Sequence, residues 1–583
     1  MTTTTTIVTF HSVFRSIYIR QLIFNHISNI SNQLYQSYLL GGGGRSYSDN
    51  GTNIRRQSLS LKGRDIIKLP LLEMISIYAM PWNFISHYLP LEVDKDDDDD
   101  DNDNQILTVS RRERVINRYC LHPNATLDTL LRLLEWSPIM DDFDWDYLRL
   151  KSGSAVTNQE VLEYLIKRCP KDDQFLVEAM SVASNHGYLS TVKLIDSIDG
   201  ARANSIAMDV ACSNGFIEIL KYLHYNRTEG CSIQAMEQSA THGHLDVVKF
   251  LHFNRTEGCR TVAMNEATKN GHLEVVKFLH FNRTEGCTRK TMDHAARNGH
   301  LEIVKFLHEH RQEGCTKDAM DYSSCNGFID IVKFLHLNRT EGATTNAMNW
   351  AAQNGHLDIV RYLDEHRSEG ATDMALDEAS KNNHMDIVKY LHQHRSEGAT
   401  TDAMDWAAEN GHIEIVQFLH ERRTEGATTQ AMNKAAENGF IDIVKFLHER
   451  RTEGATTDAM NKASENNHVE IVKFLHFNRS EGCTKRAVEL ACRRGYLEMA
   501  SFLINVRKEK CDIALLRTVS NDGRYDIVKL ILSQFGDDGR LSIDSLERLI
   551  NQLTNKGHFE TRQLLKVHLK QLQEKNKPKL PIQ

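Results

Sequence analysis

The chain has 583 residues, 40% of them hydrophobic and 25% charged, and its formal net charge is -8. A net charge this small for the length gives no reason to expect nucleic acid or a membrane surface as a partner. The sequence has no run of about 18 apolar residues, so no transmembrane helix is expected. Its 11 cysteines are scattered without a C-x-x-C pair, which favours a reducing, intracellular setting, most simply the cytoplasm.

The N-terminal 48 residues contain no Asp or Glu, are rich in Ser and Thr, and include an amphipathic stretch from Phe10 to Ile30. This composition overlaps with that of organelle transit peptides, so targeting to an organelle is one interpretation. The other is a helix over that stretch, packed on the segment that follows it. A glycine-rich stretch from Gly41 to Gly51 and an acidic run from Asp94 to Asn104 cannot bury apolar surface and are predicted to be disordered linkers.

Between these two linkers lies LPLLEMISIYAM, from Leu69 to Met80. It weakly resembles the opening helix of an F-box, which in a substrate adaptor docks onto a ubiquitin ligase. A Leu-Pro pair followed by an apolar helix is common. The resemblance therefore supports only an alternative function, in which the repeats hold a target and the N-terminal helices dock a ligase subunit.

A short motif, Asn-Gly-His or Asn-Gly-Phe, then recurs with a fixed period. Its turn residue occupies 13 positions from Gly187 to Gly523, each 28 residues after the last, and a looser unit follows at Gly557. A period of this size predicts a solenoid, whose units bury their apolar faces on one another. Just upstream, Thr126–Trp136 and Thr157–Cys169 are predicted helices of degenerate units that cap the array.

Each unit carries two apolar patterns with helical spacing. In one copy Ala459, Met460 and Ala463 share a face, and the stretch from Ile471 to Leu475 forms a second one. The turn residue between them is Gly, or Asn in two copies, the residues that most readily end a helix in a left-handed conformation. The second connection, typified by RTEGATT, supplies Gly and then a Thr that is expected to cap the next helix.

The clearest copy is AAENGHIEIVQFLHE, from Ala407 to Glu421. With its paired alanines, Gly-His turn and leucine-rich second helix it resembles an ankyrin repeat, and short-repeat ankyrin proteins of amoebae are similar. The family's Thr-Pro-Leu-His opening is replaced by forms such as Thr401–Asp405, and the unit is about five residues shorter than the usual 33. The resemblance implies an all-α solenoid of stacked helix-turn-helix repeats. Because the missing residues belong to the β-hairpin loops, we expect truncated loops and almost no strand.

The search for catalytic chemistry finds no P-loop, zinc-protease, nucleophile-elbow or kinase motif, so no enzyme, cofactor or metal site is expected. The 28 histidines fall mainly in two columns, after the turn residue and at the end of the second helix. Equivalent residues of adjacent repeats lie about 10 Å apart, whereas zinc ligands lie about 2 Å from the ion. We therefore interpret the histidines as structural. Some copies have Cys and others Ala at the site after Glu-Gly, which indicates a small buried slot.

Two columns of the first helix differ between copies, five and two residues before the turn residue. These positions are three apart and therefore neighbours on one helical face, which resembles the concave binding surface of the ankyrin family. Large aromatic residues there are candidate binding hot spots; the alternative is that they wedge between successive first helices. The candidate protein-binding residues are His294, Tyr322, Trp350 and Trp406, with Asp293, Asp321, Asn349 and Asp405 one position earlier.

These patterns predict a monomeric, non-enzymatic scaffold that binds other proteins of unknown identity through the first-helix face of an ankyrin-like α-solenoid. The predicted organisation is a helical segment over 1–40, a flexible linker over 41–60, a helical segment over 61–93, an acidic disordered linker over 94–105, a degenerate helical cap over 106–172, an array of 13 units over 173–535, a capping unit over 536–574 and a disordered tail over 575–583.

Overall fold

The computed structural model describes residues 75–76, 79–82, 109–136, 143–145, 147–148, 156–170, 174–535, 541–553 and 558–575. The predictions for 1–40, 41–60 and 94–105 lie outside these residues, as do most of 61–93 and most of the F-box-like stretch. Of the tail predicted over 575–583 the structure describes Lys575 alone, as the last residue of a helix. Two compact units make up the chain, Met1–Cys287 and Thr288–Gln583.

The first unit contains a short series of N-terminal helices and then paired helices. Its helices are α6 (Val109–Cys120), α7 (Leu127–Trp136), α9 (Gln159–Ile166), α10 (Gln174–His186), α11 (Leu189–Asp196), α12 (Ser205–Ser213), α13 (Ile217–Asn226), α14 (Ile233–Thr241), α15 (Leu245–Asn254), α16 (Val262–Lys269) and α17 (Leu273–Asn282). The two degenerate helices predicted upstream of the array are α7 and α9.

The second unit continues the pairing. Its helices are α18 (Lys290–Arg297), α19 (Leu301–His310), α20 (Asp318–Cys325), α21 (Ile329–Asn338), α22 (Asn346–Gln353), α23 (Leu357–His366), α24 (Met374–Lys381), α25 (Met385–His394), α26 (Asp402–Glu409), α27 (Ile413–Arg422), α28 (Thr429–Asn438), α29 (Ile441–Arg450), α30 (Thr457–Glu465), α31 (Val469–Asn478), α32 (Lys485–Arg494), α33 (Leu497–Ser501), the π-helix η2 (Phe502–Val506), α34 (Ile513–Asn521), α35 (Tyr525–Phe535), α36 (Ile543–Gln552) and α37 (Phe559–Lys575).

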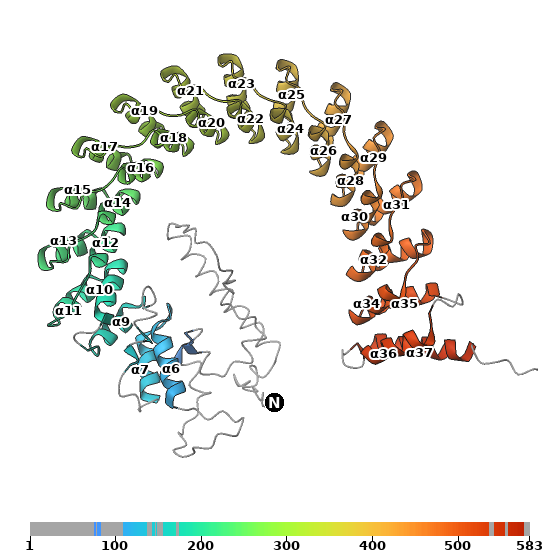
Figure 1. Ribbon diagram of the computed structural model, residues 1–583, viewed down its shortest axis with the longest axis horizontal. Coiled ribbons are helices and arrows are strands. Elements are labelled where there is room, and N and C mark those ends of the chain that lie inside the picture. The colour runs from blue at the N-terminus through green and yellow to red at the C-terminus, as the bar shows by residue number, and fades with distance from the viewer. Residues whose placement is uncertain are drawn as a thin grey trace, which may run out of the picture. The chain divides into compact units, whose positions relative to one another are not determined.

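Within each unit the helices lie in two rows, one of first helices and one of second helices (Figure 1). Consecutive first helices, such as α26 and α28, pack closely along their length, whereas consecutive second helices, such as α27 and α29, meet at few residues. Small residues explain the difference, because the alanines of the first helices let two backbones approach each other. The first helices therefore lie on the inner side of the curve that each unit makes (Figure 1).

The core of a repeat is the pair of apolar stripes that the sequence predicts. On α26 the residues Met404, Ala407 and Ala408 are at most 2% exposed, and on α27 Val416 and Leu419 are at most 3% exposed. Full burial of a Val, Leu or Met side chain contributes about 1.5–3 kcal/mol relative to exposure. Since one helix pair cannot cover its own stripes, this burial depends on the neighbouring repeats.

The turn between the two helices has the predicted left-handed backbone. Gly411 has a φ of 85°, and Asn383 and Asn467, which replace glycine in two copies, both have a φ of 65°. Space is a second constraint, since a Cβ atom on Gly411 would lie 2.6 Å from Cε1 of Phe440 in the next repeat. The ring of the residue that follows a turn glycine thus packs against the turn of the preceding repeat.

The predicted threonine caps are also confirmed. The Thr428 side chain accepts a hydrogen bond from the Gln430 N–H, and Thr456 accepts one from the Asp458 N–H. The secondary structure of the described residues consists of helices without strands, in agreement with an all-α solenoid and truncated hairpin loops. None of the described helices combines the length and the apolar character needed to cross a membrane.

Candidate protein-binding surface

Aromatic side chains on successive first helices of the second unit form a stack. Tyr322 on α20 and Trp350 on α22 have ring centroids 5.5 Å apart and an interplanar angle of 21°. The guanidinium carbon of Arg297, on α18, lies 4.6 Å from the centroid of the Tyr322 ring. Stacked aromatic pairs contribute about 0.5–1.5 kcal/mol beyond their buried area, and cation–π contacts about 0.5–1 kcal/mol at exposed sites. The stack therefore crosses three repeats.

A polar link carries this surface on to Trp406, on α26. Glu378, on α24, accepts a hydrogen bond from Gln353 Nε2 at 3.3 Å and forms an ion pair with Lys381 at 3.6 Å. The Lys381 ammonium in turn lies 4.8 Å from the centroid of the Trp406 ring. We call the residues from α18 to α26 on this face the aromatic strip; its members are Arg297, Tyr322, Trp350, Gln353, Glu378, Lys381 and Trp406.

The predicted aromatic residues are neither fully exposed nor enclosed between layers. Tyr322, Trp350 and Trp406 are half-buried, as is His294 one turn before Arg297 on α18. Tyr322, Trp350 and Trp406 therefore each contact a neighbouring side chain and remain partly exposed to solvent. The structure thus brings Tyr322 and Trp350 into contact and places Trp406 on the same face, two repeats beyond Trp350.

The four residues that precede these positions require a correction. Asp293, Asp321, Asn349 and Asp405 were expected beside the aromatics on the binding face, but they are only 4%, 2%, 4% and 6% exposed. One residue along a helix is a rotation of about 100°, which turns these side chains away from the strip and toward the following repeat. These four side chains are therefore buried between repeats and do not belong to the exposed surface of the strip.

Their contacts explain why the column holds only short polar residues in this region. Asp321 accepts two hydrogen bonds from the next repeat, from the Thr344 N–H at 2.8 Å and from the Thr344 hydroxyl at 2.6 Å. Thr344 Oγ1 accepts in turn from the Asn346 N–H, which belongs to the first turn of α22. The carboxylate therefore holds the cap of the next first helix.

Asparagine performs the same task without a charge. Asn349 Oδ1 accepts from the Thr372 N–H at 3.0 Å, and its Nδ2 donates to Thr372 Oγ1 at 2.9 Å. In the carboxylate copies burial raises the pKa of Asp321, an effect that the hydrogen bonds from Thr344 partly offset. The sequence does contain a signal for this tie, because a threonine follows each of these residues at a distance of 23 positions.

Beyond α26 the same two columns carry ion pairs. Lys434, on α28, lies 3.5 Å from Glu409 and 3.1 Å from Glu437. Lys462, on α30, lies 3.5 Å from Glu437 and 3.3 Å from Glu465. Arg494, on α32, ends this ion-pair ladder at 2.8 Å from Glu465. Sequence reasoning identified these positions as variable but did not pair them.

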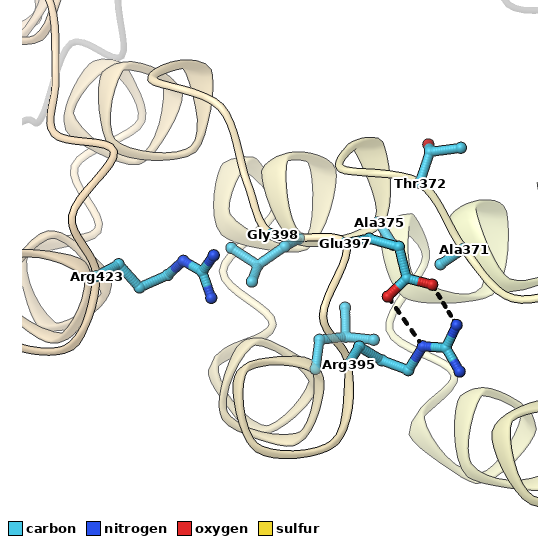
Figure 2. Close-up of a pocket in the computed structure, with 9 residues that line it drawn as sticks. Ala371, Thr372, Ala375, Arg395, Glu397, Gly398 and Arg423 are labelled. Atoms are coloured by element: carbon cyan, nitrogen blue, oxygen red, sulfur yellow. Dashed lines mark hydrogen bonds and ion pairs between the residues drawn. The ribbon is translucent and has the colours of Figure 1, made fainter.

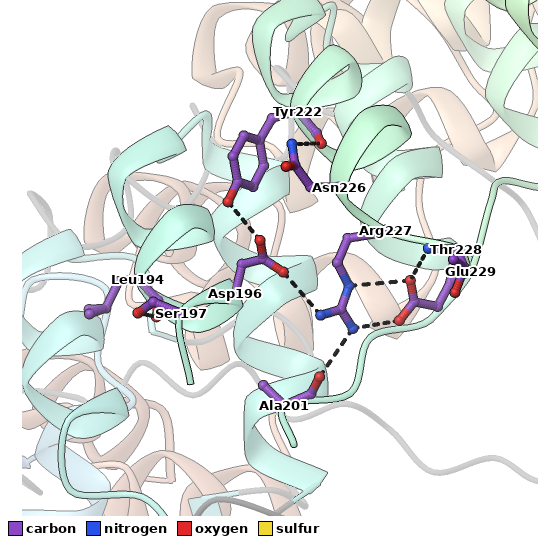
Figure 3. Close-up of polar contacts among 9 residues, drawn as sticks. All are labelled: Leu194, Asp196, Ser197, Ala201, Tyr222, Asn226, Arg227, Thr228 and Glu229. Atoms are coloured by element: carbon purple, nitrogen blue, oxygen red, sulfur yellow. Dashed lines mark hydrogen bonds and ion pairs between the residues drawn. The ribbon is translucent and has the colours of Figure 1, made fainter. Parts of the chain in front are cut away.

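The recurring Arg-Thr-Glu-Gly also forms a contact between repeats, which we call the Arg–Glu clamp. In Figure 3 Arg227 binds Glu229 with two nitrogens and reaches back to Asp196 at 3.1 Å. The Tyr222 hydroxyl donates to the same Asp196 at 2.7 Å (Figure 3). Most other repeats have a histidine at the position of Asp196.

That histidine belongs to the column at the end of the second helix. His392 Nδ1 lies 3.3 Å from Arg423 Nη1 of the next clamp, and its ring meets Phe418 edge-on with centroids 5.4 Å apart. The other histidine column also joins repeats, since His412 Nε2 lies 3.0 Å from the Lys381 carbonyl oxygen. Among the described residues no group of three or more His, Cys, Asp or Glu side chains is arranged to hold a metal ion.

A small pocket lies at one clamp in the second unit. Figure 2 shows Arg395 bonded to Glu397 at its wall, with Arg423 of the next clamp nearby. The pocket has room for about one water molecule. It is a gap at the junction between repeats rather than a site for a small-molecule ligand.

The cysteine slot after Glu-Gly is buried in some copies and half-buried in others. Cys315 and Ala343 are each 2% exposed, and Cys231 is half-buried. Burial raises the pKa of Cys315 to about 12, so its thiol stays protonated at neutral pH. None of the 11 cysteines, all of which lie in the described part of the chain, forms a disulfide bond.

A family model for ankyrin repeats in groups of three copies matches five overlapping segments of the chain, at residues 233–321, 263–347, 319–405, 376–461 and 404–487. Residues 233–487 thus consist of ankyrin repeats, in agreement with their stacked helix pairs. The closer resemblance to ankyrin proteins of amoebae stays a prediction.

No match is found among curated proteins. Among solved structures the chain is similar to the crystal structure of the pentatricopeptide repeat protein PPR10 from maize, at 11% sequence identity and a TM-score of 0.25. The match covers 88% of this chain and 93% of that one. A TM-score this low carries no argument about fold or function.

Proposed function

We propose that this protein is a non-enzymatic scaffold and that the aromatic strip is where a partner protein docks. Ankyrin repeats are protein-interaction modules with extended concave binding surfaces. The observation that carries the proposal is the stack of Arg297, Tyr322 and Trp350 across three first helices, with part of each ring open to solvent. The strip belongs to the first helices, which form the inner row of their unit (Figure 1).

The physical advantage of such a strip is its rigidity. Tyr and Trp side chains have few rotatable bonds, and here stacking and cation–π contacts already fix their planes. A partner that packs on them loses little side-chain entropy of the scaffold, so more of the contact energy appears as affinity. Truncation of a residue of this kind at an interface costs about 2 kcal/mol or more when it is a hot spot.

The alternative explanation is that the aromatics only join successive first helices. Other repeats of the same unit argue against it, because Lys434 and Lys462 occupy the same column as Trp350 and Trp406 without loss of the helix pair. Neighbouring first helices pack closely in both stretches. Since the fold is formed with lysine at this position, it does not require an aromatic there.

Proximity labelling with the full-length chain tests the proposal. Cells express the wild type, a Trp350→Ala/Trp406→Ala variant and, as the matched control, a Lys434→Ala/Lys462→Ala variant that removes side chains from the same column. We expect the tryptophan variant to lose partners that the lysine variant keeps. A partner identified in this way should bind the purified tryptophan variant at least tenfold more weakly than the wild type.

Thermal unfolding of the three proteins separates binding from folding. Loss of partners together with an unchanged melting temperature supports the strip as the docking site. The same set of labelled proteins for all three chains would contradict it, and loss of partners in the lysine variant alone would move the site to the ion-pair ladder.

We further propose that the protein acts as a monomer in a reducing compartment, most simply the cytoplasm. Support comes from the 11 cysteines, all within the described residues, none of which forms a disulfide bond. Burial holds several of these thiols protonated, as at Cys315, by raising the thiol pKa. Sedimentation velocity of the purified chain measures the oligomeric state, and imaging of a C-terminally tagged chain tests the location. Import into an organelle would favour the transit-peptide interpretation of the N-terminus.

A further inference from the structure

Three consecutive second helices of the first unit end in an exposed aromatic side chain. Tyr225 on α13, Phe253 on α15 and Phe281 on α17 are 71%, 70% and 66% exposed. The three residues occupy the same position in their repeats, 28 residues apart. We call them the second-helix ridge. They lie on the other row of helices from the first-helix face, which contains the aromatic strip in the second unit.

The fold does not need these aromatics, because the chain itself contains a second version of the same helix end. In the ridge an asparagine follows the aromatic and caps the helix, as where Asn254 Nδ2 donates to the Phe250 carbonyl at 2.8 Å. In the other version Gln393 is followed by His394, whose Nδ1 lies 3.0 Å from the Tyr390 carbonyl oxygen. Both versions satisfy the same carbonyl. The copies with a polar residue in place of the aromatic include Glu309, Glu365, Gln393, Glu421 and Glu449.

Contacts between repeats make the ridge continuous. The Tyr225 ring lies 6.3 Å from that of Phe250 in the next repeat, and the Phe253 ring lies 6.2 Å from that of Phe278. Tyr225 and Phe253 therefore each contact a ring that lies about one turn before the exposed aromatic of the next second helix. In the second unit an exposed apolar residue of this column has polar residues at the same position of both neighbouring repeats. Phe477, for example, lies between a glutamate and an asparagine in this column.

Size and shape restrict what can cover the ridge. Three largely exposed aromatic side chains present about 450 Å² of surface, within the range of the largest apolar patch on a monomer and one that is often functional. Since helices pack about 10 Å apart, the ridge is about 20 Å long and one side chain wide. A second copy of the chain that used this ridge alone would bury about half of the roughly 800 Å² per partner typical of a stable interface.

We propose that the second-helix ridge binds an amphipathic α-helix of a partner protein, with large apolar residues at every seventh position. Seven residues of an α-helix rise about 10.5 Å, close to the spacing of the repeats. An extended strand returns to the same face about every 6.7 Å and would fall out of step after one repeat. The diameter of a helix, about 10–12 Å, also suits a ridge of this width.

Charges beside the ridge specify the flank of that helix. A lysine lies four residues before each aromatic, one turn along the same face. Lys221 and Lys277 form ion pairs with Glu218 and Glu274, at 2.9 and 2.8 Å. Lys249, between them, instead has its ammonium 6.0 Å from the centroid of the Phe278 ring. An acidic residue in the middle of the partner helix would meet Lys249.

A designed peptide can serve as the probe. It has about 21 residues, leucine at every seventh position, a central glutamate on the flank and alanine-rich remaining positions; a control peptide of the same composition has its leucines at every second position. Fluorescence anisotropy measures the binding of each labelled peptide to the full-length protein. We expect micromolar binding of the first peptide and binding of the control at least tenfold weaker.

Variants of the full-length chain then locate the site. In Tyr225→Glu/Phe253→Glu/Phe281→Glu each aromatic becomes the residue that other copies carry at this position, so folding should be preserved. We expect this variant to bind the heptad peptide at least tenfold more weakly. The matched control is Phe477→Glu, which removes an equally exposed but isolated aromatic and should bind as the wild type does.

Several outcomes would overturn the proposal. Equal affinity of the triple variant and the wild type would show that the peptide binds elsewhere. Equal affinity of the two peptides would show that spacing is not recognised. If sedimentation velocity at about 50 µM finds a dimer of the wild type that the triple variant does not form, the ridge is covered by a second copy of the chain instead. Because the aromatic strip is unchanged in these variants, none of these outcomes bears on the strip as the docking site. A dimer would, in addition, contradict the proposed monomeric state.

Discussion

Two stretches of the second unit use the same positions in opposite ways. From α20 to α26 the surface of the first helices carries the half-buried aromatics of the strip, and carboxyl groups such as Asp321 and Asp405 lie beneath it. From α28 to α32 the surface carries the ion-pair ladder, and the amides of Asn433 and Asn461 lie beneath it. The helix pairs are the same in both.

The contrast separates what the scaffold requires from what each stretch adds. A buried tie to the next repeat is required, and either a carboxylate or an amide supplies it. The surface column is free to differ. In the ladder the charges neutralise one another within the protein, whereas in the strip the aromatic side chains stay partly exposed to solvent. The same surface can therefore either present aromatic side chains to a partner, as we propose for the strip, or pair its own charges, as in the ladder.

The largest effect on folding is expected from breaking the buried tie. Asp321→Ala leaves the N–H and the hydroxyl of Thr344 without their acceptor, and loss of a helix cap or of a buried partner costs about 2 kcal/mol. Because repeat proteins lose stability locally, amide hydrogen exchange in α20 and α22 is the appropriate measurement. We expect exchange there to become faster by more than tenfold.

The matched control is Asp321→Asn. Asn349 makes both hydrogen bonds to Thr372 in the neighbouring repeat, so an amide at position 321 should hold Thr344 equally well and change the local free energy of opening by less than about 0.5 kcal/mol. Equal acceleration of exchange in the Ala and Asn variants would show that the carboxylate has a task beyond this tie.

A smaller effect should distinguish the two stretches by pH. Burial raises the pKa of Asp321, Asp377 and Asp405 above the ordinary value for aspartate. A raised folded-state pKa favours the protonated folded form, so the stabilisation from these groups is complete below the unfolded pKa of about 3.9 and is lost as pH rises through the folded pKa. Replacement of all three by Asn removes this dependence.

We therefore expect the triple Asn variant to gain stability relative to the wild type as pH rises from about 4 to 7. Thermal unfolding of both proteins across this range provides the measurement. The glutamates of the clamps, such as Glu369 with its pKa lowered to about 2, titrate alike in both proteins and cancel in the difference. A difference that stays constant with pH would show that the carboxyl groups do not titrate differently on folding.

Much of the fold could be predicted from the sequence because the same local patterns recur in every repeat. The period, the two apolar stripes, the left-handed Asn383 and the cap of Thr428 all depend on residues close together in the chain. The surface column with Trp350 could be located for the same reason, since comparison among copies shows which position differs. These features need no knowledge of how one repeat meets the next.

The features that sequence analysis missed all lie between repeats. The position of Asp321, one residue before Tyr322, predicts a place beside the aromatics, whereas its side chain is buried and binds Thr344, 23 residues away. The Arg–Glu clamp has a weaker signal in the sequence. Where Asp196 and Asp364 replace the usual histidine, tyrosine stands 26 residues later and bonds to them, at 2.7 and 2.8 Å. Paired substitutions of this kind are readable in a repeat sequence.

The smallest effect is expected from the ladder itself. Lys462→Ala removes two ion pairs, with Glu437 at 3.5 Å and Glu465 at 3.3 Å. Its side chain is 37% exposed, and pairs of this kind contribute about 0.2–1 kcal/mol, so we expect a loss of about 0.5 kcal/mol in the local stability of α28 and α30. Amide exchange measured in low salt and in 1 M NaCl tests whether this stability is electrostatic in origin. The Debye length falls to about 3 Å at 1 M, so exposed ion pairs are strongly screened.

High salt should bring the wild type close to Lys462→Ala in the ladder and leave exchange in α22 and α26 nearly unchanged, because stacked rings are not screened as exposed ion pairs are. Glu409→Gln, at the border between the stretches, should behave like a weaker Lys462→Ala, since it removes one pair with Lys434 at 3.5 Å. If salt loosens both stretches equally, charge pairing is not what sets the ladder apart. Proximity labelling with variants of the ladder would then test whether the ladder also binds partners.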